Sequence, residues 1–202
     1  MKKIKKLVIA SAMVLSLSPI FGGNASEAAA AGTHQVQKGD TYYKIATQYG
    51  VSVLDLMRVN SGNKASVIYP GQKMTLPNSF ITETEKDLIA RLVQAEAEAE
   101  PYAGKVAVAS VVLNRMASPD FPNTVKEVIY QKSNGYFAFT PVQNGAINKP
   151  ASALAKKAVN EALAFRGQGK GSLFFYNPKT AKSPWILTRE TTITIGNHKF
   201  AK

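Results

Sequence analysis

The 202-residue chain contains no cysteine and only two histidines, His34 and His198. Without cysteine it can form no disulfide and carry no thiol-linked lipid, so core packing alone must hold the fold. The same shortage argues against a cysteine nucleophile and against a zinc site built from histidine and cysteine. We therefore expect no metal and no cofactor, and we expect His198 to be a structural, hydrogen-bonded residue. Carboxylates remain as the candidates for proton transfer.

The N-terminal end carries an apolar stretch at residues 7–21, between a basic start at residues 1–6 and small residues up to position 31. This stretch is shorter than the roughly 20 residues that a membrane-spanning helix needs. The pattern predicts a secretory signal peptide over residues 1–31, and therefore a secreted chain without stable membrane insertion after cleavage. An uncleaved membrane anchor is the alternative.

Acidic residues are few, since 13 Asp and Glu against 25 Lys and Arg give a net charge of +12. Removal of residues 1–31 would leave 21 basic and 12 acidic residues, so the chain would stay basic. A basic surface attracts polyanions such as nucleic acid, a membrane surface or the anionic wall of a bacterium. The basic residues form no arginine-rich run and the chain is expected to be exported. We therefore expect the wall, and not nucleic acid, as the partner.

Residues 33–77 have the pattern of a small domain in the order strand, helix, helix, strand. We expect strands at residues 34–36 and 73–76, and helices at residues 41–49 and 52–60. Asp40 or Thr41 can cap the first helix, which Gly50 ends, and Ser52 can cap the second.

Two motifs in this segment, Val36-Gln37-Lys38-Gly39-Asp40-Thr41 and Ile68-Tyr69-Pro70-Gly71-Gln72, make it resemble a LysM repeat. The resemblance implies binding of chains that contain N-acetylglucosamine, such as peptidoglycan, in a shallow groove between the two loops. The implied contact residues are Gly39, Asp40, Thr41, Ile68, Tyr69 and Pro70. For Gly39 and Gly71 the alternative is that each glycine serves only its turn.

After the short link Pro77-Asn78-Ser79, residues 80–202 are long enough to form a second domain with its own core. Thr84 and Asp87 can form a capping box for a helix that we expect to end near Glu100, before a new helix that begins at Pro101. Further helices are expected at residues 106–115 and 151–165, and strands at residues 172–176 and 191–195. The fold class is therefore α+β, a helical lobe with a small β-sheet. We expect the candidate catalytic acid, Glu96, to lie in the cleft between the lobe and the sheet.

Three carboxylates, Glu96, Glu98 and Glu100, stand at alternate positions at the end of the first helix expected in the second domain. On a helix Glu96 and Glu100 share a face, whereas Glu98 points elsewhere. The negative end of the helix dipole and the like charge of Glu100 should raise the pKa of Glu96, as a general acid requires. A solvated acidic face on an alanine-rich helix is the alternative reading of the same pattern.

The second domain also carries a series of motifs in order: Ala90-Arg91-Leu92-Val93, Glu96-Ala97, Glu100-Pro101-Tyr102, the run at residues 106–115, Phe137-Ala138-Phe139, residues 174–178, and Ile195-Gly196-Asn197-His198-Lys199-Phe200. Together they resemble the spore cortex-lytic (SleB-type) cell-wall hydrolase family. The resemblance implies a lysozyme-like or lytic-transglycosylase-like fold, with Glu96 as the catalytic glutamate. The usual Glu-Ala-Arg-Gly-Glu of that family reads Glu96-Ala97-Glu98-Ala99-Glu100 here, which removes a cation and a glycine.

We therefore expect a wall-associated or spore-envelope enzyme that cleaves the β-1,4 bond between N-acetylmuramic acid and N-acetylglucosamine. The resemblance favours a lytic transglycosylase with the single acid Glu96. A hydrolase that uses Glu100 as a second carboxylate, and a peptidoglycan-binding protein without activity, are the alternatives. An amidase or peptidase is disfavoured, because such enzymes generally need zinc or a cysteine. Five residues of the domain are further candidates for substrate binding: Asn114, Arg115, Phe137, Tyr176 and Asn177.

Overall fold

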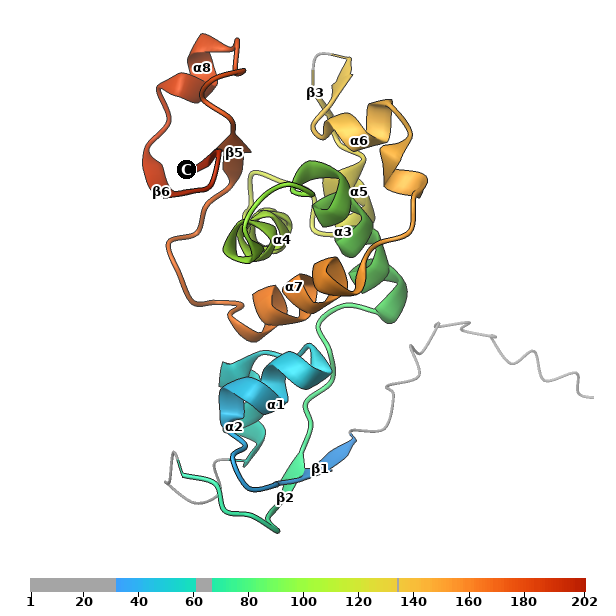
Figure 1. The fold of residues 1–202 in the computed structure, drawn as a ribbon, viewed down its shortest axis with the longest axis vertical. Helices are drawn as coiled ribbons and strands as arrows, with labels where there is room; N and C mark the ends of the chain where they lie inside the picture. The colour runs from blue at the N-terminus through green and yellow to red at the C-terminus, as the bar shows by residue number, and fades with distance from the viewer. Residues whose placement is uncertain (1–31, 61–66, 134) are drawn as a thin grey trace, which may run out of the picture.

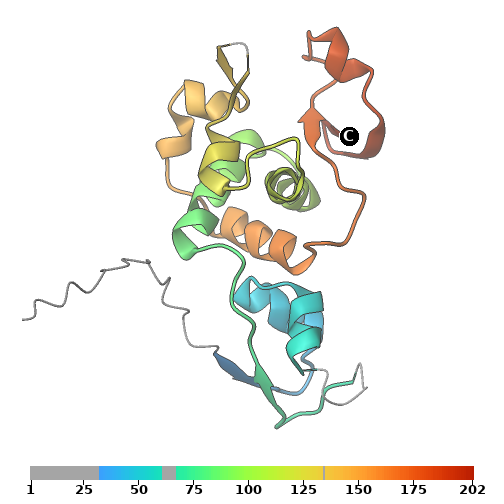
Figure 2. The ribbon, with the colours of Figure 1, turned by 180° about the vertical axis from the view of Figure 1, so that it is seen from behind.

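The computed structural model describes residues 32–60, 67–133 and 135–202. The predicted signal peptide lies outside the described residues. Figure 1 shows a smaller N-terminal part below helix α7 and a larger part above it. The view from behind in Figure 2 shows the same stacking. In the described part of the chain, no helix is both long and apolar enough to cross a bilayer.

The smaller part has the predicted order of strand, helix, helix and strand. It consists of β1 (Thr33–Gln35), α1 (Tyr42–Tyr49), α2 (Val53–Asn60) and β2 (Lys73–Thr75), and β1 pairs with β2 in antiparallel fashion. The Thr41 side chain accepts a hydrogen bond from the Lys44 backbone at the start of α1, and Gly50 ends that helix with a φ of 60°. Ile45, Leu56 and Met74 are fully buried in the core of this part.

The larger part combines helices with two small antiparallel sheets, which confirms the predicted α+β class. Its helices are α3 (Glu83–Glu96), α4 (Tyr102–Ala117), α5 (Val125–Ile129), α6 (Thr140–Gln143), the 3-10 helix η1 (Ala146–Asn148), α7 (Ala153–Ala164) and α8 (Pro184–Leu187). Its strands are β3 (Lys132–Ser133), β4 (Tyr136–Phe137), β5 (Phe174–Tyr176), β6 (Thr191–Ile195) and β7 (His198–Ala201). The last three form a sheet in the order β5-β7-β6.

Both predicted boundaries of helix α3 are wrong. Helix α3 is capped by Thr82, which forms a capping box with Glu85, and not by Thr84 with Asp87. Both pairs fit the motif, but the carboxylate of Asp87 instead pairs with Arg91 and Lys156 at 3.1 and 3.3 Å. The same helix ends at Glu96, one turn earlier than predicted.

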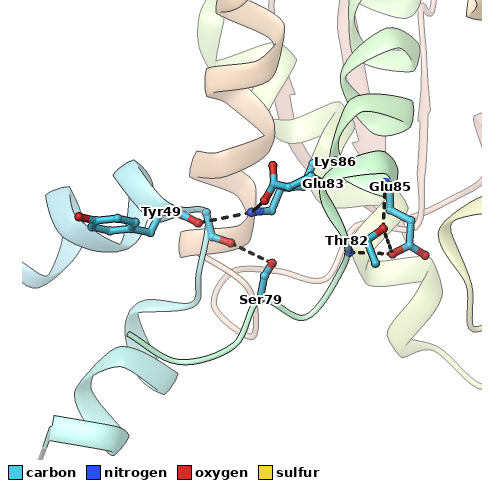
Figure 3. A network of polar contacts seen from close by, with 7 residues as sticks. Tyr49, Ser79, Thr82, Glu83, Glu85 and Lys86 are labelled. Atoms are coloured by element: carbon cyan, nitrogen blue, oxygen red, sulfur yellow. Dashed lines mark hydrogen bonds and ion pairs between the residues drawn. The ribbon is translucent and has the colours of Figure 1, made fainter. Parts of the chain in front are cut away.

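The two parts pack directly on each other. Ala164 of α7 is fully buried in the core cluster of the smaller part, and the rings of Tyr43 and Phe165 lie 5.3 Å apart. Figure 3 shows the polar contacts beside this packing. Lys86 of α3 pairs with Glu83 at 2.7 Å and donates a 3.4 Å hydrogen bond to the Tyr49 carbonyl.

Gly50 lies at the centre of this junction. The Ser79 hydroxyl donates a 3.4 Å hydrogen bond to its carbonyl. A Cβ atom at this position would lie 2.6 Å from the Asn160 side-chain oxygen and 2.9 Å from the Lys86 ammonium. The absence of a side chain here therefore allows both the left-handed turn and the close approach of the two parts.

Candidate active site

A cavity of about 320 Å³ lies where the helices of the larger part meet its C-terminal sheet. Glu96 reaches it from the end of α3, Arg115 from α4, and His198 from β7. The remaining lining residues come from the segment before and into α6 and from β5 with the loop after it: Ala138, Phe139, Thr140, Phe175, Tyr176, Asn177, Thr180 and Ala181. Glu96 is the one carboxylate that lines this cavity within the described part of the chain.

The position of Glu96 is set by the packing of α3 and by a buried lysine. Leu92 and Val93 of the last turns are fully buried, and so is Ala97, which follows Glu96. Lys105 of α4 is only 6% exposed, and its ammonium donates to the Ala97 carbonyl and, at 2.7 Å, to the Glu98 carbonyl. A buried cation thus satisfies carbonyls at the negative end of the helix. This contact fixes the turn directly after Glu96.

The surroundings of Glu96 favour the protonated acid. Burial raises the pKa of its carboxyl to about 7, and a hydrogen bond with the Thr140 backbone offsets part of this increase. The residue keeps some exposure although its carboxyl is largely desolvated, as a group that must meet a substrate requires. The sequence predicted the direction of this pKa shift but not its cause, which is desolvation. Near neutral pH such a carboxyl can both donate and accept a proton.

Glu100 lies in a different environment and does not line the cavity. Its carboxylate accepts hydrogen bonds from the Asn197 backbone at 2.9 Å and from the Asn197 side chain at 3.1 Å. Burial would raise its pKa, but these hydrogen bonds and the nearby His198 and Lys105 lower it overall. Because α3 ends at Glu96, the expected helical pairing of the two carboxylates does not form. The geometry therefore does not support Glu100 as a second catalytic carboxylate.

Three of the five candidates for substrate binding, Arg115, Tyr176 and Asn177, line the cavity with Glu96. Arg115 is 7% exposed and its Nε donates a 2.7 Å hydrogen bond to the Leu173 carbonyl. Its guanidinium lies over three aromatic rings, 4.9 Å from those of Phe121 and Phe139 and 5.5 Å from that of Phe174. Burial lowers its pKa to about 10. Arg115 therefore joins α4 to the sheet and closes one wall of the cavity.

Asn114 and Phe137, the other two candidates, are not in this cavity. The Asn114 amide donates a 2.9 Å hydrogen bond to the Ser172 carbonyl and faces a separate cavity of about 240 Å³. Phe137 lies on β4, where the Lys132 ammonium is 4.5 Å from its ring. Neighbours in sequence on α4 point in different directions, which explains why Arg115 reaches the cavity and Asn114 does not.

Several lining residues were missed as site residues, notably Phe139, Thr140, Phe175 and His198. Phe139, Phe175 and His198 lie within motifs that carry the resemblance, so a signal was present. Only the fold selects which residue of each motif faces inward. His198 also differs from the prediction, because its buried Nδ1 has no hydrogen-bond partner among the described residues.

The two predicted glycan-binding loops of the smaller part lie next to each other. Val36 accepts a 2.8 Å hydrogen bond from the Gly71 backbone and donates one of 2.8 Å to the Gln72 carbonyl. Tyr69 is 66% exposed, Pro70 and Gly39 are exposed, and Ile68 packs partly on the core.

Asp40 and Thr41 already have structural partners within these loops. The Asp40 carboxylate binds His34 Nε2 and accepts from the Gln37 backbone, both at 2.8 Å. These hydrogen bonds outweigh burial and lower the pKa of Asp40. Thr41 caps α1, so the exposed surface for a ligand is mainly Gly39, Tyr69 and Pro70.

Among the residues that the structure describes, no three histidine, aspartate or glutamate side chains gather as a metal site would require.

Comparison with known proteins identifies both parts of the chain. Residues 34–77 match the LysM domain, and residues 99–201 match the Cell Wall Hydrolase family. A spore cortex-lytic enzyme of Bacillus cereus is 41% identical over 145 residues, which cover 71% of this chain and 54% of that protein. A spore cortex-lytic enzyme of Bacillus subtilis is 39% identical over 127 residues, which cover 63% of this chain and 40% of that protein.

A solved structure gives the same result. The catalytic domain of the germination-specific lytic transglycosylase SleB from Bacillus anthracis matches with a TM-score of 0.56 and 41% identity, over 63% of this chain and all of that one. The chain spans about half the length, or less, of the spore cortex-lytic enzymes it matches. The family match covers just over half of the chain and most of the larger part. The chain therefore belongs to the cell wall hydrolase family and carries a LysM domain ahead of its hydrolase domain.

Proposed function

We propose that this chain is a secreted, wall-bound enzyme that cleaves the β-1,4 bond between N-acetylmuramic acid and N-acetylglucosamine in peptidoglycan. The observation that carries the proposal is the cavity around Glu96, where a largely desolvated carboxyl has a pKa of about 7. A carboxyl of this pKa is poised to protonate a leaving oxygen near neutral pH. The similarity to a lytic transglycosylase catalytic domain supports the same reaction.

In the proposed reaction Glu96 gives its proton to the oxygen that bridges the two sugars. The bond between that oxygen and the anomeric carbon of N-acetylmuramic acid then breaks. The Glu96 carboxylate then takes a proton from a hydroxyl of the same muramic acid residue. The oxygen of that hydroxyl attacks the anomeric carbon and closes an anhydro ring. Glu96 ends protonated, as it began, and no water is consumed.

The environment of Glu100 favours this route over hydrolysis by two carboxylates. Two-carboxylate glycosidases place the second carboxyl about 5 to 9 Å from the first, on either side of the bond. Here Glu100 is held by Asn197 at the β6–β7 turn and does not line the cavity. A single carboxyl that acts first as acid and then as base fits the lytic transglycosylase reaction.

We also propose that the LysM part holds the enzyme on the glycan strand through its two adjacent loops. The exposed ring of Tyr69 offers apolar area, and the backbone at Gly39 can be approached closely. The positive net charge of the chain supports association with an anionic cell wall. The spore cortex is one candidate substrate of this kind.

The test is Glu96→Gln, assayed by release of muropeptides from purified peptidoglycan and by the masses of the products. Loss of one general acid is expected to lower release by about 100-fold or more. Glu98→Gln is the matched control, because Glu98 is exposed and lies outside the cavity. Products of the parent should carry anhydro ends.

Three outcomes would contradict the proposal in different ways. Unchanged release by Glu96→Gln would refute Glu96 as the acid. Reducing ends in place of anhydro ends would indicate a hydrolase. No release by the parent would indicate a binding protein.

A further inference from the structure

His198 is the one histidine of the larger part, and the proposed reaction does not yet use it. Its ring lines the Glu96 cavity and packs against two aromatic side chains, with ring centroids 5.3 Å from Phe175 and 6.3 Å from Phe200. Nδ1 is buried and has no hydrogen-bond partner among the described residues. Buried polar atoms without partners are rare in folded proteins, and each calls for a reason.

The missing partner of Nδ1 indicates which nitrogen carries the proton. Buried N–H groups without an acceptor are rarer in folded proteins than buried acceptors without a donor, which favours an unprotonated Nδ1. The neutral ring therefore keeps its proton on Nε2, the nitrogen left to face the cavity. Burial also lowers the pKa of His198, and the nearby Glu100 charge offsets part of this decrease, so the ring is neutral near pH 7.

Glu100 fixes the turn that leads into His198. Its carboxylate holds both the backbone and the side chain of Asn197, the residue just before His198. Gly196 adopts a φ of 58°, and a Cβ atom there would collide with the Glu100 carboxylate and lie 2.7 Å from Pro101 Cδ. By holding this turn, Glu100 also fixes the place of the His198 imidazole. Glu100 therefore acts as a positioning residue.

We propose that His198 is a substrate-contacting residue, whose Nε2–H donates a hydrogen bond to an oxygen of the N-acetylated sugar bound beside Glu96. This inference rests on the proposed function. His198 would give the cavity a neutral hydrogen-bond donor. Within the described chain Glu96 is the one carboxylate that lines this cavity, and Arg115 is already engaged by the Leu173 carbonyl and three aromatic rings. A neutral donor can orient a sugar without adding a charge beside the acid.

Two substitutions separate hydrogen bonding from packing. His198→Phe keeps an aromatic ring against Phe175 and Phe200 but removes the donor. His198→Gln removes the ring but can place an amide N–H near the position of Nε2. We expect His198→Phe to keep the parental Tm and to lose about 10-fold in kcat/KM on glycan fragments, the factor that one hydrogen bond of about 1.4 kcal/mol provides. His198→Gln should keep more activity than His198→Phe, even if its Tm falls.

Two activity results would overturn the inference. One is a His198→Phe variant with the parental kcat/KM. The other is a larger loss in His198→Gln than in His198→Phe, which would indicate that the ring acts by packing and not as a donor.

A second measurement does not depend on catalysis. In the full chain labelled with nitrogen-15 histidine, the His198 resonances, assigned by comparison with His198→Phe, should report the Nε2–H tautomer. They should shift when N-acetylglucosamine oligomers are added to the Glu96→Gln variant. An Nδ1–H tautomer, or no shift at saturating oligomer, would overturn the inference even if the parent cleaves peptidoglycan. The expected tautomer and shift in a chain that cleaves nothing would instead count against the proposed reaction alone.

Discussion

Glu96 and Glu100 are identical in chemistry and only four positions apart, yet their surroundings shift their pKa values in opposite directions. At Glu96 a largely desolvated cavity raises the pKa to about 7. At Glu100 the competing effect of burial is outweighed by hydrogen bonds from Asn197, and the pKa falls. The first carboxyl is suited to hold a proton, and the second is suited to stay charged and hold a turn.

The difference shows that the role of a carboxylate depends on its partners and not on its spacing. The end of α3 at Glu96 separates the two side chains, and Lys105 secures that end through the Ala97 and Glu98 carbonyls. The chain then turns so that Glu100 meets a hairpin almost one hundred residues further along. Three predictions test this contrast.

The largest expected effect is a change in the pH dependence of stability when Glu96 is replaced. Its folded pKa of about 7 lies above the ordinary value of 4.5, so between these values the native state binds more protons than the unfolded state. The free energy of unfolding of the parent should therefore fall as pH rises from 4.5 to 7, by about 1–3 kcal/mol. Glu96→Gln should lack this decrease and gain stability relative to the parent at pH 8.

Urea unfolding of parent and variant at pH 4.5 and pH 8 measures this effect. Glu98→Gln serves as the control and should follow the parent at both pH values. Parallel behaviour of parent and Glu96→Gln would mean that the Glu96 carboxyl is not desolvated.

A smaller loss is expected when the lysine that secures the end of α3 is removed. Lys105→Met keeps the apolar stem but leaves the Ala97 and Glu98 carbonyls without their donor. Because the Glu98 carbonyl is only partly buried and can bind water instead, the free energy of unfolding should fall by about 1–2 kcal/mol. Because the turn after Glu96 loosens, kcat should also fall, as thermal unfolding together with an activity assay would reveal. The exposed Lys126→Met is the control, and equal stability of the two variants would contradict the role of Lys105.

The smallest effect is expected at Glu100. Glu100→Gln retains one acceptor for Asn197, and the site is largely open to solvent, so the loss of stability at pH 7 should be about 1 kcal/mol or less. The lowered pKa means that the stabilisation by Glu100 is present above the ordinary value of 4.5 and is lost as pH falls further. Parent and Glu100→Gln should therefore converge in stability once the pH falls below the lowered pKa of folded Glu100. A difference that persists at acid pH would exclude the charge of Glu100 as its source.

The fold was more predictable than the site because its signals are local. The caps at Thr41 and Gly50 and the apolar spacing of the helices gave the order of the LysM elements and the α+β class. The capping box of α3 was misplaced because Thr82 and Thr84 begin competing motifs only two residues apart. Its end was misplaced because an interaction with Lys105 of the next helix, which the local pattern does not show, helps to fix it.

By itself, the sequence determined the two-part organisation, the family resemblance and Glu96 as the candidate acid, since all of these depend on residue types at short spacing. Only the tertiary structure decided that Glu96 faces a desolvated cavity, that Glu100 binds Asn197, and that His198 lines the cavity while Asn114 and Phe137 do not. The physical reason is that burial and hydrogen bonding between distant segments set the pKa and the orientation of a side chain, and neither is encoded in its immediate neighbours.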